Sequence, residues 1–397
     1  MKKVYLPLIL AGAMVSCDQG LEESGMDANM GDIGLKTASA QQVSVQAEPL
    51  RKVDRDDRTI NEISFPATHN TYNYKGSTFS KSNVFDDMPE QFEKGIRAVE
   101  IDIHEKRTWF KKDVSVYHGK MTNGFNGSRL AHYVLAEITE FIEDNPQEIV
   151  FLKFETTVSG STLDKEIREA GLDEHIYEYD ESNPYPTKEE VVASGKRVVI
   201  TRHIDGSAYG RALDRHTFGG GYSDNGDHKP QSSPSEKKFF SVERYGITGT
   251  FGYGDADRAK YLNHPSRLAP FVDDVWKLNG KKPWRVIVDF PSVHSGNYYT
   301  VIRELNDKEM LKGEIRTADG NLLLKKDGKL INWTWECQYA EEMVTAKTSA
   351  EFSFPMNDGE TVTIRPVSDE YTFVPASLTV TNDNTSDLMQ VFTAVPK

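Results

Sequence analysis

The chain has 397 residues, of which 38% are hydrophobic, a composition typical of globular proteins, and its length suggests two or three domains. Its formal net charge of −14 argues against binding to nucleic acid and against general attraction to an anionic surface, and no run of Lys or Arg offers an evident local exception. Two cysteines, Cys17 and Cys337, are too few for a disulfide framework, and no internal stretch of about 18 apolar residues predicts a membrane span.

The first 17 residues have the pattern of an export signal. Two lysines precede a short apolar run and then small residues that end at Cys17. This resembles a bacterial lipoprotein signal peptide, although Met14 is unusual at its position, and an ordinary signal with an incidental cysteine remains an alternative. We expect an exported bacterial lipoprotein, anchored through Cys17 on the periplasmic or outer-surface side of a membrane. Residues 18–50 lack periodicity and predict a flexible tether.

Apolar strands alternate with helical segments over residues 51–310. A helix is predicted over residues 129–145, where Leu130, Val134, Ile138 and Ile142 recur at helical spacing. The predicted strands cover residues 97–103, 114–119, 148–155, 197–201 and 284–290, together with a first strand that ends at His69. This alternation predicts an α/β fold, a (β/α) barrel like that of triosephosphate isomerase, in an irregular form.

Two further segments have their own patterns. Residues 206–254 are rich in Gly, Ser and Asp and are expected to form a long loop that is functional or mobile. Residues 311–397 show alternating strands and turn residues, which predicts a small all-β sandwich with Cys337 in its core. This segment resembles the transthyretin-like or immunoglobulin-like accessory modules of exported bacterial proteins.

Polar side chains gather at the ends of the predicted strands. Because side chains alternate along a strand, Glu100 and Asp102 share one face, and Lys153 and Glu155 share one face of another strand. Parallel strands of a barrel end at one rim. We therefore expect a single cavity to hold His69, Asn70, Glu100, Asp102, His118, Lys153, Glu155 and Asp289.

Three carboxylates in one cavity repel each other unless positive charge lies between them. Glu100, Asp102 and Glu155 form, with the amide oxygen of Asn70, an all-oxygen ligand set that suits Ca²⁺ better than zinc. The alternative, an ion pair inside the barrel between Lys153 and a glutamate, stays open.

Two histidines follow different predicted strands and face the same cavity. Such a pair, His69 and His118, can supply a general base and a general acid. Asp289 is a candidate to hold one imidazole in its working tautomer. His132 has no evident partner in the sequence and is assigned no role.

Five motifs occur in order along the chain. They are "PATHNTY", "GIRAVEIDI", "VYHG", "VLAEITEFIEDNPQEIV" and "FLKFE". Together they resemble the catalytic X-box of phosphatidylinositol-specific phospholipase C, best over residues 63–155. The resemblance implies that His69 deprotonates the inositol 2-hydroxyl and that His118 protonates the leaving diacylglycerol oxygen.

This family has metal-independent secreted bacterial members and calcium-dependent members. The former have an Asp after the first histidine and a "GIRxxDIR" pattern, where this chain has Asn70 and Asp102. "HNTY", "EID" and Glu155 are similar to the calcium-dependent type, which implies Ca²⁺ bound by Asn70, Glu100, Asp102 and Glu155.

Three other residues receive roles at this stage. Asp289, in "VIVDFPS", resembles the aspartate that pairs with the first histidine in the secreted bacterial enzymes. Lys153 and Arg202 are candidates for contacts to phosphate or inositol, on position alone.

We expect a phospholipase C that cleaves phosphatidylinositol or a related inositol phospholipid at a membrane surface. One alternative is a glycerophosphodiester phosphodiesterase, but the "RG" and "PEN" motifs of that family do not follow the first histidine. Another is a non-catalytic surface lipoprotein that binds inositol lipids or glycans, which would need neither an acid nor a base. No conspicuous hydrophobic loop predicts how the chain meets a bilayer, and the sequence indicates no oligomeric state.

Overall fold

The computed structural model describes residues 55–75, 82–107, 109–119, 127–180, 182–211, 218–224, 237–248, 253–383 and 388–397. These residues belong to one compact unit, Ala47–Lys397. The predicted signal peptide, the predicted lipid anchor at Cys17 and the tether over residues 18–50 lie outside the described residues.

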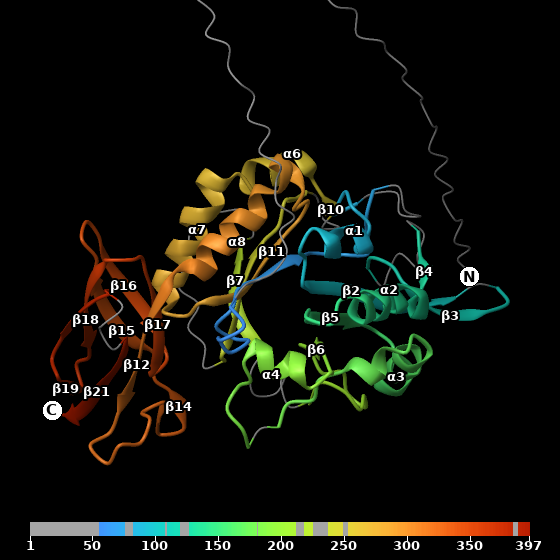
Figure 1. Cartoon of the computed structure of the whole chain (residues 1–397). Coiled ribbons are helices and arrows are strands. Elements are labelled where there is room, and N and C mark those ends of the chain that lie inside the picture. Colours follow the sequence, from blue (N-terminus) through green and yellow to red (C-terminus); the bar gives the residue numbers. More distant parts are fainter. Residues whose placement is uncertain are drawn as a thin grey trace, which may run out of the picture. The chain divides into compact units, whose positions relative to one another are not determined.

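A parallel sheet forms the first part of this unit (Figure 1). In sheet order its strands are β6 (Val198–Ile200), β5 (Val150–Thr156), β2 (Ala98–Arg107), β1 (Phe65–Thr68), β11 (Pro283–Val288), β8 (Phe239–Arg244) and β7 (Phe218–Asp224). Within the described residues no ladder joins β6 to β7, so the barrel is open there. The predicted α/β class is confirmed.

Helices cover the outer face of this sheet (Figure 1). They are α1 (Met88–Glu93), α2 (Ala131–Asp144), α3 (Gly160–Glu169), α4 (Lys188–Ala193), α6 (Ala256–Leu262), α7 (Pro265–Asn279) and α8 (Asn297–Asp307), with the 3-10 turns η2 (Leu172–His175) and η3 (Val293–Gly296). In α2 the residues at helical spacing, Val134, Ile138 and Ile142, are buried against the strands. A separate cluster that includes Phe65, Phe151 and Trp284 fills the inner face.

The predicted strand over residues 114–119 does not belong to the parallel sheet. β3 (Lys112–Val116) pairs antiparallel with the second half of β2 and with β4 (Arg129–Leu130). β2 is ten residues long, so its first half pairs with β5 while its second half extends beyond the barrel as a hairpin. A short connection permits antiparallel pairing, whereas a parallel neighbour needs a longer crossover.

The predicted long loop over residues 206–254 contains two barrel strands, so this expectation was wrong. β7 and β8 pair with each other, and β8 pairs with β11. A small hairpin of β9 (Ile247–Thr248) and β10 (Tyr253–Gly254) follows. Three consecutive glycines in β7 remove the alternation of apolar side chains that usually indicates a strand.

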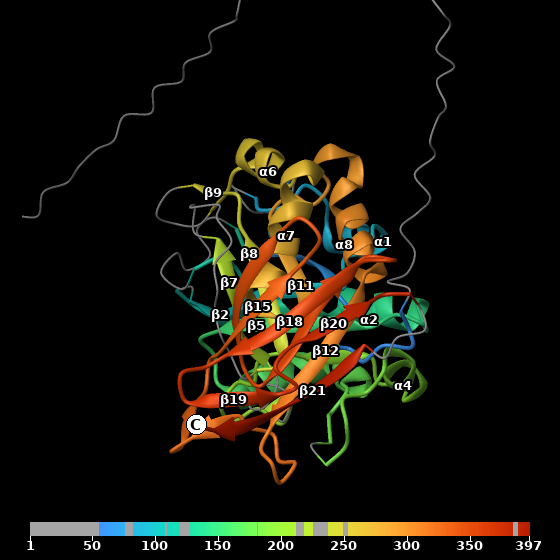
Figure 2. The same cartoon turned by 90° about the vertical axis from the view of Figure 1, so that its left-hand side faces the viewer.

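Two antiparallel sheets form the C-terminal part (Figure 2). In sheet order, the first contains β17 (Glu351–Met356), β12 (Glu309–Arg316), β21 (Met389–Pro396) and β19 (Tyr371–Val374). The second contains β16 (Met343–Thr348), β15 (Trp333–Gln338), β18 (Thr361–Val367) and β20 (Leu378–Thr381). β12 and β21 alone run parallel among the described ladders of this part, and β13 (Lys325–Lys326) pairs with β14 (Lys329–Leu330). The predicted all-β part is confirmed.

The C-terminal sheets enclose their own apolar core and contact the barrel through α7. Trp335, Phe354 and the free thiol of Cys337 are buried in this core. The indole of Trp276 in α7 donates a hydrogen bond to the carbonyl of Ser353 in β17 at 2.8 Å. None of the described helices combines the length and hydropathy needed to span a membrane.

Candidate active site

Charged side chains face each other across neighbouring barrel strands. β2 and β5 are parallel, and their register places Glu100 opposite Lys153 and Asp102 opposite Glu155. Since alternate side chains of a strand point to one face, all four lie on the same face of the sheet. This face is the one expected from the sequence.

His69 and Asp289 meet because the strands that precede them are paired. Thr68 of β1 lies opposite Val288 of β11, so the next residue of each chain segment leaves the sheet at the same place. His69 Nδ1 lies 2.9 Å from Asp289 Oδ1, and Asp289 is fully buried. Asn83 donates a second hydrogen bond to Asp289 Oδ1 at 3.0 Å. The carboxylate therefore fixes the orientation of the imidazole.

Asn70 lies beside the imidazole in a left-handed turn. Its φ angle is 48°, in a region that Asn tolerates better than most residues with a side chain. Its Nδ2 lies 3.0 Å from His69 Nε2, and the hydroxyl of Tyr72 donates to its Oδ1 at 3.4 Å. Because β1 ends at Thr68, His69 and Asn70 both leave the sheet at the rim of the barrel.

The pKa of His69 is raised to about 9. Burial by itself lowers this pKa, but the charge and hydrogen bond of Asp289, with the charges of Glu100 and Asp102, outweigh burial. The ring of Tyr245 stacks on the imidazole at a centroid distance of 4.2 Å.

His118 lies just after β3, beside the middle of β2, where the barrel half of that strand ends. The amide of Tyr117 donates to the carbonyl of Asp102 at 3.2 Å, which brings His118 to the same rim. Burial and the charge of His69 lower the pKa of His118, while Glu155 and other carboxylates oppose the shift. The two histidines thus act electrostatically on each other.

Lys153 pairs with two of the three predicted calcium-binding carboxylates. Its ammonium contacts Glu100 Oε1 and lies 3.1 Å from Glu155 Oε1. Burial raises the pKa of Glu100, but the charge and hydrogen bond of Lys153 reverse this and leave it lowered. The ion pair that the sequence left open therefore forms in the substrate-free protein.

Negative charge nevertheless remains in excess. Burial and the charges of Glu155 and Glu100 raise the pKa of Asp102 to about 7. Two buried oxygens, Glu100 Oε2 and Asp102 Oδ1, have no hydrogen-bond partner. Unpaired acceptors beside surplus negative charge fit a hard cation, provided that the ammonium of Lys153 moves away.

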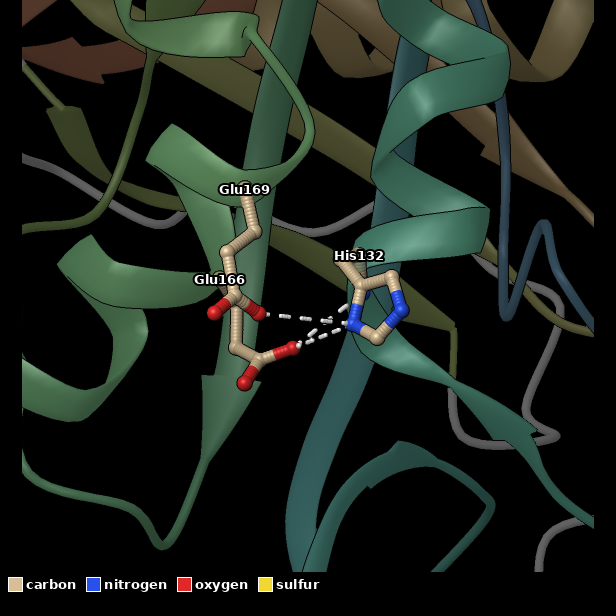
Figure 3. A group of neighbouring side chains, drawn as sticks. All are labelled: His132, Glu166 and Glu169. Atoms are coloured by element: carbon tan, nitrogen blue, oxygen red, sulfur yellow. Dashed lines mark hydrogen bonds and ion pairs between the residues drawn. The ribbon is translucent and has the colours of Figure 1, made fainter.

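Within the part of the chain that the structure describes, only His132, Glu166 and Glu169 bring three ligand atoms of these types within 4.8 Å of one another. Figure 3 shows this group, with His132 on α2 facing both glutamates on α3. His132 Nδ1 lies 3.1 Å from Glu166 Oε2, so His132 has a partner that the sequence did not reveal. This group belongs to helices α2 and α3, away from the barrel strands that carry the predicted calcium set.

The structure adds Arg285 to the site and leaves Arg202 apart. Arg202 is exposed after β6, and the described contacts do not join it to the carboxylates. Arg285 of β11 is buried, donates to Ser241 Oγ at 2.8 Å and contributes to lowering the pKa of Glu100. Arg285 precedes Asp289 by four residues, so period-two alternation could have placed both on one face.

Comparison with known proteins identifies the segment that carries this geometry. Residues 56–218 match the family model described as PI-PLC X 1. No curated protein sequence matches the chain. Its fold is similar to that of a phosphatidylinositol-specific phospholipase C from Listeria monocytogenes, with 18% identity, a TM-score of 0.41 and coverage of 63% of this chain and 95% of that one. A Staphylococcus aureus phosphatidylinositol-specific phospholipase C gives 15% identity, a TM-score of 0.41 and coverage of 63% and 94%. The match to this model includes His69, His118 and the carboxylates of β2 and β5, whereas Asp289 and Arg285 lie outside the matched segment.

Proposed function

We propose that the protein is a phospholipase C that cleaves phosphatidylinositol or a related inositol phospholipid into diacylglycerol and a cyclic inositol phosphate. The observation that carries the proposal is the buried His69–Asp289 pair, which shares one rim of an X domain with His118. The two similar solved structures bear the name of this activity, which agrees with the proposal.

The proposed reaction moves one proton at each histidine. His69 Nε2 takes the proton of the inositol 2-hydroxyl, whose oxygen then bonds to phosphorus. The bond from phosphorus to the glycerol oxygen breaks, and His118 gives a proton to that leaving oxygen. Asp289 holds His69 through Nδ1, so Nε2, which Asn70 Nδ2 contacts at 3.0 Å, is the nitrogen that would turn to the substrate.

The pKa shifts of the two histidines run in the direction opposite to these roles. The pKa of His69 is raised to about 9, whereas burial and His69 lower that of His118. The proposed roles need neutral His69 and protonated His118. A phosphate anion beside His118 favours its protonated form, and less negative charge on Glu100 and Asp102 would lower the pKa of His69.

A calcium ion meets the first requirement in this proposal, because its positive charge would lower the pKa of His69, while the phosphate anion meets the second. Asn70, Glu100, Asp102 and Glu155 would hold it, and two of their buried oxygens are unpaired. When bound, Ca²⁺ would supply positive charge for the phosphate oxygens and reduce the carboxylates' effect on His69. Lys153 would then be released from Glu100 to contact the phosphate.

The proposed setting is the surface of a membrane. An inositol phospholipid presents its headgroup there, and the predicted lipid anchor at Cys17 would keep the enzyme near a bilayer. We propose, on the same signal, an exported bacterial lipoprotein.

An Asp289→Asn variant tests the histidine pair. Loss of the negative charge is expected to lower the pKa of His69 by at least about one unit. In the parent, the pKa of His69 is about 9, above its ordinary value of 6.5, so protonated His69 stabilises the folded protein by about 3 kcal/mol. This contribution is complete below pH 6.5 and is lost as the pH rises through 9. NMR titration of labelled histidines measures the midpoint, and an unchanged midpoint in the variant contradicts the pairing.

Replacing the proposed acid tests the mechanism. A His118→Ala variant is expected to hydrolyse phosphatidylinositol about 100-fold more slowly or worse, because the leaving oxygen then departs without a proton. His175→Ala is the matched control, since His175 belongs to η2 on the outer helical layer and is expected to retain activity. Full activity of the His118 variant would refute the assigned role.

Chelation tests the cation independently of the histidines. Activity toward phosphatidylinositol is expected to disappear with a calcium chelator and to return with added calcium. Glu155→Gln is expected to raise the calcium concentration for half-maximal activity about ten-fold or more, while Glu140→Gln, an exposed change on α2, leaves it unaltered. Activity indifferent to chelation would defeat the calcium assignment and favour Lys153 as the resident cation.

A further inference from the structure

The hairpin of β2 and β3 ends in two fully exposed aromatic side chains. Arg107 and Lys112 form its last described ladder pair. Between them Trp109 and Phe110 are 97% and 100% exposed. Among the described residues, the next most exposed large hydrophobic side chains are those of Tyr133 and Val374, at 62%. The tip therefore differs from the rest of the described surface in having two adjacent, fully exposed aromatic residues. Such exposure of large apolar side chains indicates a contact surface.

Basic side chains surround the tip. The four cations are Lys106, Arg107, Lys111 and Lys112, and the two acids nearby are Glu105 and Asp113. Some are paired, as in Lys111–Asp113 at 2.8 Å and Arg107–Glu105 at 2.5 Å. Four cations against two acids leave a local charge of +2 in a chain with a net charge of −14. The hairpin tip is therefore a locally basic site that could attract an anionic surface, which the sequence alone did not reveal.

We propose that Trp109 and Phe110, with this basic collar, are the contact of the protein with a bilayer that carries anionic phospholipids. Tryptophan and phenylalanine enter the boundary between headgroups and acyl chains, and lysine and arginine are attracted to anionic headgroups. The aromatic tip supplies the apolar contact and the collar supplies the selectivity for charge.

The position of the hairpin agrees with the proposed function, on which this inference rests. The first half of β2 carries Glu100 and Asp102, and β3 leads to His118. The tip therefore lies beyond the carboxyl end of the barrel half of β2, the end of the barrel at which His69 and His118 lie. Figure 1 shows β3 extending away from the barrel. A bilayer touched by the tip would approach the site from the side where a headgroup must enter.

Vesicles without inositol lipid separate binding from catalysis. The full chain carrying Cys17→Ser, which cannot be lipidated, is mixed with vesicles of phosphatidylcholine and phosphatidylglycerol in equal parts. Sedimentation with the vesicles measures binding of every variant, and in the parent a blue shift of tryptophan emission reports Trp109, because the other four tryptophans, Trp276, Trp284, Trp333 and Trp335, are buried. The double variant Trp109→Ala, Phe110→Ala is expected to bind about ten-fold more weakly or worse, and Tyr133→Ala is the control.

The outcomes are distinct. Weak binding of the double variant with undiminished cleavage of a water-soluble inositol phosphodiester supports the proposal. Equal vesicle binding by the double variant and its parent overturns it, as does a parent that does not bind. If no variant cleaves the soluble substrate but vesicle binding still depends on the tip, the proposed function fails and this inference stands.

A second, independent observation concerns a cavity between the barrel and the C-terminal sheets. Its volume is about 540 Å³, and its walls include the segments before β1, β8 and β11 together with β12 and β17. These segments precede the barrel strands, so the cavity lies at the opposite end from the histidines. Lys238, Lys312 and Lys281 of its lining have partners, respectively Glu351, Glu62 and the carbonyl of Lys237.

Lys282, which also lines the cavity, is different. It is 3% exposed, and its Nζ lies 5.2 Å from the centre of the Trp276 ring but has no hydrogen-bond partner. The two acids whose charges act on it already pair with other cations, Glu62 with Lys312 and Glu309 with Arg55 and Arg58. A charged amine here lacks a counter-ion, and a neutral amine lacks its hydrogen bonds.

We infer that this cavity binds a small phosphate-bearing ligand whose anionic oxygens pair with Lys282. A phosphate would balance the surplus charge and accept the hydrogen bonds that Lys282 does not make inside the protein. Free phosphate and a phosphorylated polyol share this chemistry, and the experiment compares both.

Thermal unfolding with inorganic phosphate tests the inference, using the full chain. Phosphate is expected to raise the unfolding temperature of the parent and of an exposed control, Lys329→Met, but not that of Lys282→Met. Without phosphate, Lys282→Met should unfold at about the same temperature as the parent, because relief from burying an amine without hydrogen bonds offsets the lost contact with the Trp276 ring. Equal phosphate responses of parent and Lys282→Met, or none in the parent, overturn the inference. A larger response to glycerol phosphate than to phosphate identifies the phosphorylated polyol as the source.

Discussion

Negative charge buried at the carboxyl ends of the barrel strands is the constraint on which the site depends. Glu100, Asp102 and Asp289 are at most 4% exposed, and Glu155 joins Asp102 across the ladder. Ionised carboxylates out of water are costly unless opposite charge lies near. Lys153 forms an ion pair with Glu100, and His69 pairs with Asp289, which raises the pKa of His69 well above its ordinary value. For Asp102, burial and the charges of Glu155 and Glu100 outweigh the hydrogen bond of Tyr72 and the charge of His69, so its pKa stays raised.

The same imbalance governs how a phosphodiester could enter. A phosphate anion facing Glu100 and Asp102 meets repulsion, so positive charge must be available on the side of the cavity where it binds. Two groups could supply this positive charge. One is a calcium ion among the carboxylates, and the other is the Lys153 ammonium, released toward the substrate. With calcium bound, the charge near His69 would become less negative, and its imidazole would move closer to the neutral form that a general base needs.

The architecture separates three surfaces with different chemistry. One long strand, β2, carries the carboxylates in its first half and the exposed aromatic hairpin in its second. The C-terminal sheets contact the barrel through α7 and line a lysine-rich cavity at the other end. A bilayer, a headgroup and a small phosphate would therefore meet the protein at separate places.

Local sequence patterns determined the α/β class, the all-β C-terminal part and helix α2. They also determined that Glu100 and Asp102 share one face of a strand. These features depend on periodicity and strand propensity within a few residues. Tertiary structure decided the rest. Pairing of β7 and β8 stabilises a glycine-rich strand that has no apolar alternation of its own, and antiparallel pairing turns β3 out of the barrel. Whether Lys153 binds Glu100, whether Arg285 joins the site and whether Trp109 is buried or exposed are contacts between distant segments, set by register and packing that no local pattern encodes.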